Sequence, residues 1–72
     1  MPYINVKMID DGKTQEQKDA LIEGITTVFQ DVVGVPASSV WIVIEDIPGD
    51  NWGISGLNTT KRRAAAAKTQ GS

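Results

Sequence analysis

The fold is decided by the opening stretch of the chain, Met1-Pro2-Tyr3-Ile4-Asn5-Val6-Lys7-Met8. Its apolar residues Ile4, Val6 and Met8 alternate with Tyr3, Asn5 and Lys7, which is the period of a β-strand with one buried face. A proline at the start of a strand costs the sheet nothing, because the first residue need not donate a backbone hydrogen bond. We therefore expect a half-buried strand that begins directly after Pro2.

A helix is predicted over residues 15–33, because apolar residues recur there at three- and four-residue spacing. Thr14 and Gln17 have the spacing of a capping box at its start. Gly34 suits the left-handed position after a helix, and Pro36 closes the stop signal. The apolar stripe of this amphipathic helix consists of Leu21, Ile25, Val28, Phe29 and Val32.

A second strand is predicted over residues 40–46, whose sequence Val-Trp-Ile-Val-Ile-Glu-Asp is apolar nearly throughout. Such a run indicates burial on both faces, by parallel pairing or by contact between subunits. The glycine-rich residues 52–56 predict a short hairpin or a bulged edge. The expected fold is α+β: a single β-α-β unit with a short C-terminal hairpin over residues 1–63, followed by a polar, basic end. Residues 64–72 are expected to form a flexible tail, with a helical turn over residues 64–67 as the alternative for its start.

Composition excludes several classes of function. The 72 residues include no cysteine and no histidine, so disulfides, thiolate zinc sites and the commonest general base are absent. A formal charge of −2 disfavours nucleic acid and anionic membranes as partners. No apolar run has membrane-spanning length, and no signal peptide follows Met1, so a cytoplasmic protein is expected. A chain this short struggles to bury a sufficient core, which favours a homo-oligomer.

Pro2 is the candidate catalytic residue. Removal of Met1 would leave it as a free secondary amine at the end of a rigid strand, and a terminal amine titrates at a pH of about 7.7–8.0. The alternative is that Pro2 is only a harmless strand start. The adjacent carboxylates Asp10–Asp11 and Glu45–Asp46 are interpreted as solvated charges, because neighbours on a strand point to opposite faces. The glycines at 49, 53 and 56 lack phosphate-loop spacing and are assigned to turns.

The order and spacing of these pieces resemble the 4-oxalocrotonate tautomerase family, whose members use an amino-terminal proline. The resemblance spans residues 2–63. It implies a hexamer with active sites built by neighbouring subunits, and keto–enol tautomerisation of an enol or unsaturated 2-keto acid without cofactor or metal. Pro2 would act as general base and then general acid. The stretches that carry the resemblance are residues 1–6, 14–18, 21–22, 35–36, 38–40 and 52–56.

The resemblance also implies substrate-binding residues: the Ile9 backbone amide, Lys13, Ser39 and an aromatic wall at Trp52. Two positions depart from the family pattern. Lys13 replaces an arginine that binds the substrate's carboxylate, and a lysine lacks the planar bidentate fork. Trp41 replaces a second arginine that comes from another subunit, and an indole carries no charge.

Several alternatives follow from these departures. Lys7, Arg62 or Arg63 is a candidate to supply the missing cation. Trp41 favours a non-catalytic or weakly promiscuous member of the fold, and it is either an interface residue or a pocket wall. A decarboxylase of the same superfamily is a third interpretation. If Trp41 limits the enzyme, Trp41→Arg should raise kcat/KM on dicarboxylate enols.

Overall fold

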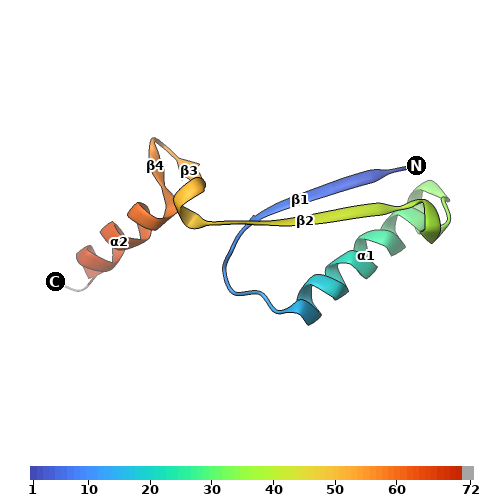
Figure 1. Cartoon of the computed structure of the whole chain (residues 1–72), viewed down its shortest axis with the longest axis horizontal. Coiled ribbons are helices and arrows are strands. Elements are labelled where there is room, and N and C mark those ends of the chain that lie inside the picture. The colour runs from blue at the N-terminus through green and yellow to red at the C-terminus, as the bar shows by residue number, and fades with distance from the viewer. Residues whose placement is uncertain (71–72) are drawn as a thin grey trace.

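The structure is a computed structural model that describes the backbone of residues 1–70 and the side chains of residues 1–67. A strand–helix–strand unit forms one end of the molecule, and a short hairpin with a second helix forms the other (Figure 1). In chain order the elements are β1 (Tyr3–Ile9), α1 (Gln15–Val33), the 3-10 helix η1 (Ala37–Ser39), β2 (Trp41–Ile47), the 3-10 helix η2 (Gly49–Asn51), β3 (Gly53–Ile54), β4 (Leu57–Asn58) and α2 (Thr59–Gln70).

The two long strands pair in parallel, from Tyr3 opposite Trp41 to Ile9 opposite Ile47. Even-numbered side chains of both strands are half-buried on the face that α1 covers, whereas most odd-numbered ones are exposed (Figure 1). The predicted strands, their parallel pairing and the half-buried face of β1 are therefore confirmed. Burial of β2 on both faces does not occur within the chain, because α1 covers only one of them.

Helix α1 ends where its capping residues predict. The Thr14 hydroxyl accepts a hydrogen bond from the Gln17 amide at 3.1 Å, and the Gln17 side chain accepts one from the Thr14 amide at 2.8 Å. At the other end, Gly34 adopts a φ of 79° and donates its N–H to the Gln30 carbonyl. This left-handed conformation is easily adopted only by glycine, so the sequence determines the end of the helix as well as its start.

The apolar stripe of α1 is wider than the sheet beneath it. Leu21, Ile25 and Phe29 are half-buried, whereas Val28 and Val32 are 57 % and 78 % exposed. The predicted amphipathic helix is therefore confirmed, but the single chain covers only part of its apolar stripe. Two strands lie only about 4.8 Å apart, while a helix with its side chains is about 10 Å across, so one flank of α1 extends beyond the sheet.

Beyond β2 the chain forms the C-terminal arm (residues 48–70). Strands β3 and β4 pair antiparallel across a two-residue turn, which confirms the predicted hairpin. The turn residues Ser55 and Gly56 have φ values of 54° and 85°, the signs that a type I′ turn requires. Helix α2 follows at once, and the Asn58 side chain accepts a hydrogen bond from the Lys61 amide at 2.8 Å.

The polar, basic residues 61–63 lie in the first turns of this capped helix, which the sequence did not predict. The expected flexible tail over 64–72 falls partly on α2, which continues to Gln70. Residues 71–72 lie outside the described part of the chain. The mobility of this segment stays a prediction.

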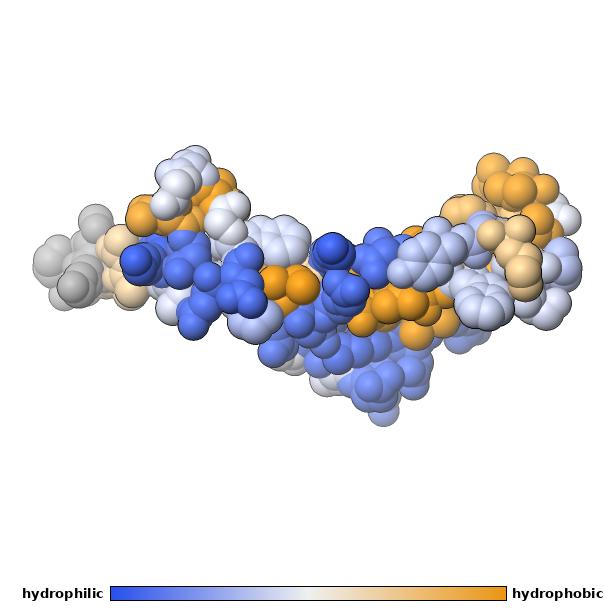
Figure 2. Space-filling model, turned by 45° about the horizontal axis from the view of Figure 1, so that its top comes forward, coloured by the Kyte–Doolittle hydropathy of each residue, from blue (hydrophilic) through white to orange (hydrophobic). Residues whose placement is uncertain are grey.

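The chain does not enclose a hydrophobic core of its own. Among residues 1–67 no apolar side chain is buried, and Thr59, which is 7 % exposed, is the single buried residue. The radius of gyration is 16.8 Å, whereas a compact chain of this length has about 11 Å. Figure 2 shows apolar surface at both ends of the molecule, over the hairpin and over the end of the sheet where the chain begins. Within the described residues, no helix has the length and hydropathy to cross a membrane.

Candidate active site

Pro2 lies at the end of the sheet where both long strands begin. Its carbonyl oxygen accepts a hydrogen bond from the Trp41 amide at 3.0 Å, which fixes the start of β1 against β2. Ser39 is close to this point along the chain, at the end of η1, where its amide donates to the Pro36 carbonyl. The parallel register therefore brings three of the predicted site residues, Pro2, Ser39 and Trp41, to one end of the molecule.

Two aromatic side chains, those of Tyr3 and Trp41, lie at the same end of the sheet as Pro2. Trp41 is opposite Tyr3 in the ladder, and the two side chains are 59 % and 63 % exposed on the face away from α1. The exposure of Trp41 is compatible with both interpretations, a subunit contact and a pocket wall.

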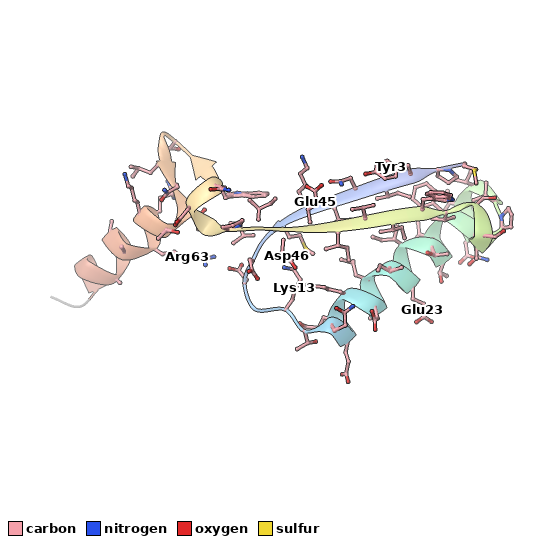
Figure 3. All side chains as sticks on the ribbon, in the orientation of Figure 1. Tyr3, Lys13, Glu23, Glu45, Asp46 and Arg63 are labelled. Atoms are coloured by element: carbon pink, nitrogen blue, oxygen red, sulfur yellow. The ribbon has the colours of Figure 1, made fainter. Side chains whose placement is uncertain are left out.

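Lys13 and Ile9 lie at the opposite end of the sheet. The Lys13 ammonium donates to the Ile9 carbonyl at 3.2 Å and to the Asp46 carboxylate at 2.5 Å. Lys18, in the first turn of α1, pairs with the other oxygen of Asp46 at 2.5 Å. Figure 3 shows Lys13 and Asp46 facing one another beside the start of α1. We refer to Lys13, Lys18 and Asp46 as the lysine–aspartate cluster.

The interpretation of Asp46 as a solvated charge is therefore wrong. Hydrogen bonds from Lys13 and then Lys18 hold the pKa of the Asp46 carboxyl below its ordinary value, and Asp46 in turn raises the pKa of Lys18. Asp46 points to the α1 side of β2, where the loop before α1 and the first turn of α1 each bring a lysine. Its neighbour Glu45 points to the open face, where Lys7 approaches it at 3.9 Å. The alternation of a strand separates the two carboxylates, but sequence alone did not reveal which lysines they meet.

The Ile9 amide is directed away from β2. In a parallel ladder the backbone groups of alternate residues point to opposite sides of the strand. Pro2 accepts from β2, and Asp10 donates to the Ile47 carbonyl at 2.8 Å, so the even-numbered residues of β1 face β2. Ile9 therefore presents its N–H at the outer edge, next to its carbonyl that Lys13 contacts. This position is compatible with the predicted role as a donor to substrate.

Two of the three candidate replacement cations are engaged elsewhere. Lys7 faces Glu45 on the open face of the sheet. Arg63 of α2 reaches back to the Asp11 carboxylate at 2.9 Å, and this hydrogen bond lowers the pKa of Asp11. Asp11 and Lys13 belong to the same loop, so this ion pair holds Arg63 of α2 against that loop (Figure 3).

Trp52 belongs to the arm rather than to the sheet. Its carbonyl accepts two hydrogen bonds from Thr59, one from the amide at 2.8 Å and one from the hydroxyl at 3.0 Å. Its own amide donates to the Gly49 carbonyl at 3.3 Å. The half-buried indole is thus set at a defined place by the turn of η2 and the start of α2.

One chain does not bring the predicted site residues together. Ile9 lies seven positions after Pro2 along the extended strand, a distance of about 23 Å at about 3.3 Å per residue. The described residues form no pocket and no cluster of metal-ligating side chains. A substrate of a few carbon atoms that touches Pro2 can therefore meet Lys13, Ile9 or Trp52 only if a second chain supplies them.

Comparison with known proteins identifies the fold and the chemistry. A family model described as tautomerase enzyme matches residues 2–62. A probable tautomerase, K2, of Dickeya dadantii is 39 % identical over 67 residues, which is 93 % of this chain and all of that protein. The 2-hydroxymuconate tautomerase of Comamonas testosteroni is 40 % identical over 58 residues, 81 % of this chain and 90 % of that protein.

Solved structures agree with this assignment. The crystal structure of TomN, a 4-oxalocrotonate tautomerase homologue in the tomaymycin biosynthetic pathway, superimposes with a TM-score of 0.82 at 28 % identity, covering 88 % of this chain and 95 % of that one. The family model and the relatives both span nearly the whole strand–helix–strand unit and the hairpin. The chain therefore belongs to the 4-oxalocrotonate tautomerase family and is a tautomerase.

Proposed function

We propose that the protein is a cofactor-independent keto–enol tautomerase in which Pro2, freed by removal of Met1, moves the proton. As a secondary amine it takes a proton from the enol hydroxyl or from carbon, and as the resulting ammonium it returns a proton to the carbon that becomes saturated. No bond to the protein forms, and no oxidant or metal enters the balance. The substrate is an enol or an unsaturated 2-keto acid.

The observation that carries the proposal is the position of Pro2. The hydrogen bond from Trp41 holds its carbonyl, so the nitrogen lies at a fixed point at the end of β1. Apolar surroundings disfavour the ammonium form of an amine, and the exposed side chains of Tyr3 and Trp41 bring apolar surface to this end of the sheet. A general base works best when its pKa lies near the operating pH, because proton transfer in both directions is then efficient.

The active protein is proposed to be a homo-oligomer, a hexamer as the family resemblance implies. The exposed face of the sheet, the uncovered flank of α1 and the apolar side chains Ile54 and Leu57 of the arm all lack cover within one chain. Assembly would bury them and would bring the Lys13 end of one chain to the Pro2 end of another. Substrate would then bind between subunits, with Ser39, Trp41 and Trp52 around it.

The test compares the wild type with Pro2→Ala on phenylenolpyruvate, whose ketonisation is followed by ultraviolet absorbance. Intact mass first establishes that Met1 is absent, because a Pro2 nitrogen in a peptide bond has no basicity. We expect Pro2→Ala to lose about 100-fold or more in kcat/KM, the usual contribution of a general acid–base group. Pro36→Ala, which removes an exposed proline from the same chain, serves as the control. Equal rates for the wild type and Pro2→Ala would exclude catalysis by Pro2.

Two further outcomes separate the alternative functions. A decarboxylase would release carbon dioxide from a β-keto acid while the enol assay stays flat. A non-catalytic protein would give neither signal. The name of the Comamonas relative makes 2-hydroxymuconate, an enol with two carboxylates, the second substrate to assay.

A mixing experiment tests whether two chains share the site. Pro2→Ala lacks the base, and Lys13→Ala lacks the cation at the far end of the sheet. If both belong to one site on different chains, unfolding the two variants together and refolding the mixture gives hybrids in which some sites are intact. Activity should then exceed that of either variant refolded alone. Strict additivity of the two residual activities would show that the site does not combine Pro2 with Lys13 of another chain.

A further inference from the structure

We propose that Asp46 is a specificity-determining residue, which positions Lys13 and restrains its charge so that the site prefers substrates with one carboxylate over dicarboxylates. The proposal rests on the proposed function above, in which Lys13 meets the substrate's carboxylate. It does not require Asp46 to touch substrate. The geometry of the lysine–aspartate cluster carries the argument.

Lys13 has few hydrogen-bond donors left for a substrate. A lysine ammonium has three N–H groups and no acceptor. In Lys13 two of them are directed to protein oxygens, one to the Ile9 carbonyl and one to the Asp46 carboxylate. One N–H is left for a ligand. Lys13 can therefore bind a substrate carboxylate at a single point, whereas an arginine presents two parallel donors.

The net charge of the lysine–aspartate cluster is also small. Lys13 and Lys18 share the two oxygens of one carboxylate, so the cluster carries one net positive charge rather than two. The side chain of Lys13 is only 16 % exposed and that of Asp46 only 23 %, so solvent screens their contact less than it screens the Lys7–Glu45 pair on the open face. A substrate with one carboxylate matches a single net charge, and the second carboxylate of a dicarboxylate finds no cation there.

The Pro2 end of the site brings apolar surface rather than charge. The Trp41 amide donates to the Pro2 carbonyl, and its exposed indole brings apolar surface rather than a cation to this end of the sheet. An unpaired carboxylate placed against that apolar surface loses hydration without compensation. An aromatic or aliphatic group fits it better. Asp46 and Trp41 therefore both favour substrates with one carboxylate. Asp46 reduces the positive charge at the Lys13 end, and Trp41 disfavours a carboxylate at the Pro2 end.

The structure offers a matched control on the same strand. Asp46→Asn and Glu45→Gln each remove one negative charge, but on opposite faces of β2, and Glu45 contacts no part of the lysine–aspartate cluster. Lys18→Gln has the opposite effect on the cluster, because Asp46 then neutralises Lys13 alone. Asp46→Glu keeps the charge and tests whether a carboxylate suffices.

The measured quantity is the ratio of kcat/KM on 2-hydroxymuconate, with two carboxylates, to kcat/KM on phenylenolpyruvate, with one. Asp46→Asn should raise this ratio about fivefold, the size expected for one partly exposed charge, mainly through a lower KM for the dicarboxylate. Lys18→Gln should lower the ratio. Asp46→Glu should keep the wild-type ratio, and Glu45→Gln should also leave it unchanged. A merely structural role of Asp46 would lower both activities in parallel and leave the ratio constant, and that result would overturn the proposal.

A binding measurement separates failure of this proposal from failure of the proposed function. The unreactive acids cis,cis-muconate and cinnamate carry two carboxylates and one, and their Kd values are measured by calorimetry on the assembled protein. Asp46→Asn should tighten muconate relative to cinnamate even if the protein proves inactive on both enols. If Asp46→Asn fails to fold, as judged by circular dichroism, Lys18→Gln decides. An unchanged ratio of Kd values in Lys18→Gln would then refute the role of Asp46.

Discussion

The strand–helix–strand unit and the C-terminal arm are stabilised in different ways. The unit has a seven-residue parallel ladder and a helix capped at both ends. The arm has strands of two residues, and polar contacts hold it: Thr59 to the Trp52 carbonyl, Asn58 to the start of α2, and Arg63 to Asp11. Both regions nevertheless leave apolar side chains exposed. Regular secondary structure alone therefore does not complete either region, and we expect both to gain contacts from other chains.

The largest effect is expected from a charge placed on the open face of the sheet. Val43 lies on that face of β2 and is 41 % exposed. If another chain covers it, Val43→Asp buries a carboxylate without a partner, which costs several kcal/mol. We expect the assembly to dissociate, as measured by sedimentation velocity. Gln30→Asp, on the exposed polar side of α1, adds the same charge and should leave the sedimentation coefficient unchanged. An intact assembly in Val43→Asp would show that this face is not an interface.

The next prediction compares two neighbouring side chains of α1. Phe29 is half-buried under the sheet, so Phe29→Ala should lower the free energy of unfolding by about 2–3 kcal/mol, somewhat less than for a fully buried phenylalanine. Val28 is exposed in the single chain, and Val28→Ala would cost only a few tenths of a kcal/mol there. Denaturant titration at fixed protein concentration measures both. A loss above about 1 kcal/mol for Val28→Ala would show that a second chain covers this flank.

These two residues also show how far the sequence predicts the fold. Apolar spacing identified α1 and its caps, because periodicity and capping are local properties. Spacing placed Val28 and Phe29 in one stripe, but it does not state how wide the covering sheet is. That width depends on which strands pair, and on how many chains contribute strands. The exposed position of Val28 therefore could not be derived from helix periodicity.

The candidate site was predicted to a different extent. Pro2 is identified by its position in the sequence, since only the first residue after Met1 can become a terminal amine. Asp46 was misinterpreted, because its partners Lys13 and Lys18 are 33 and 28 positions away and meet it only after β2 pairs with β1. Helix α2 was missed because the Asn58 cap follows a glycine-rich turn and no apolar period marks the helix.

The capping box of α1 gives a prediction of intermediate size. Thr14→Ala removes the hydroxyl that accepts a hydrogen bond from the Gln17 amide, and it should lower the free energy of unfolding by about 1 kcal/mol. Thr27→Ala is the matched control, because its hydroxyl bonds only to the Glu23 carbonyl within the helix and alanine is the better helix former. Urea denaturation distinguishes the two. Equal stability of Thr14→Ala and Thr27→Ala would contradict a role for the cap.

Acid should weaken the two regions through different carboxylates. Lysine hydrogen bonds hold the folded pKa of Asp46 below its ordinary value of 3.8, and Arg63 does the same for Asp11. The unfolded state therefore binds more protons between the folded pKa and 3.8. The stabilisation is complete above that window and is lost as the pH falls through the folded value. Unfolding at pH 2–5 measures it.

Variants assign the acid effect to one region or the other. Asp46→Asn should flatten the pH dependence of unfolding of the strand–helix–strand unit, and Asp11→Asn should flatten that of the contact to the arm. Glu45→Gln is the control, with its carboxylate on the opposite face and 3.9 Å from Lys7. If Asp46→Asn retains the full acid slope, the lysine–aspartate cluster does not stabilise the fold.

The smallest effect is expected at the hairpin turn of the arm. Ser55 adopts a φ of 54°, which an ordinary side chain enters at a cost and asparagine tolerates well. Ser55→Asn gives the Asn-Gly pair that type I′ turns favour, and should raise stability by about 0.5 kcal/mol, or about 2–4 °C in Tm. Ser55→Val, which is β-branched, should lower Tm instead. Because the arm is held mostly by polar contacts, a rise in Tm for Ser55→Asn would also show that the arm unfolds together with the strand–helix–strand unit. If Ser55→Asn and Ser55→Val have the same Tm, the arm separates from the unit before the main transition.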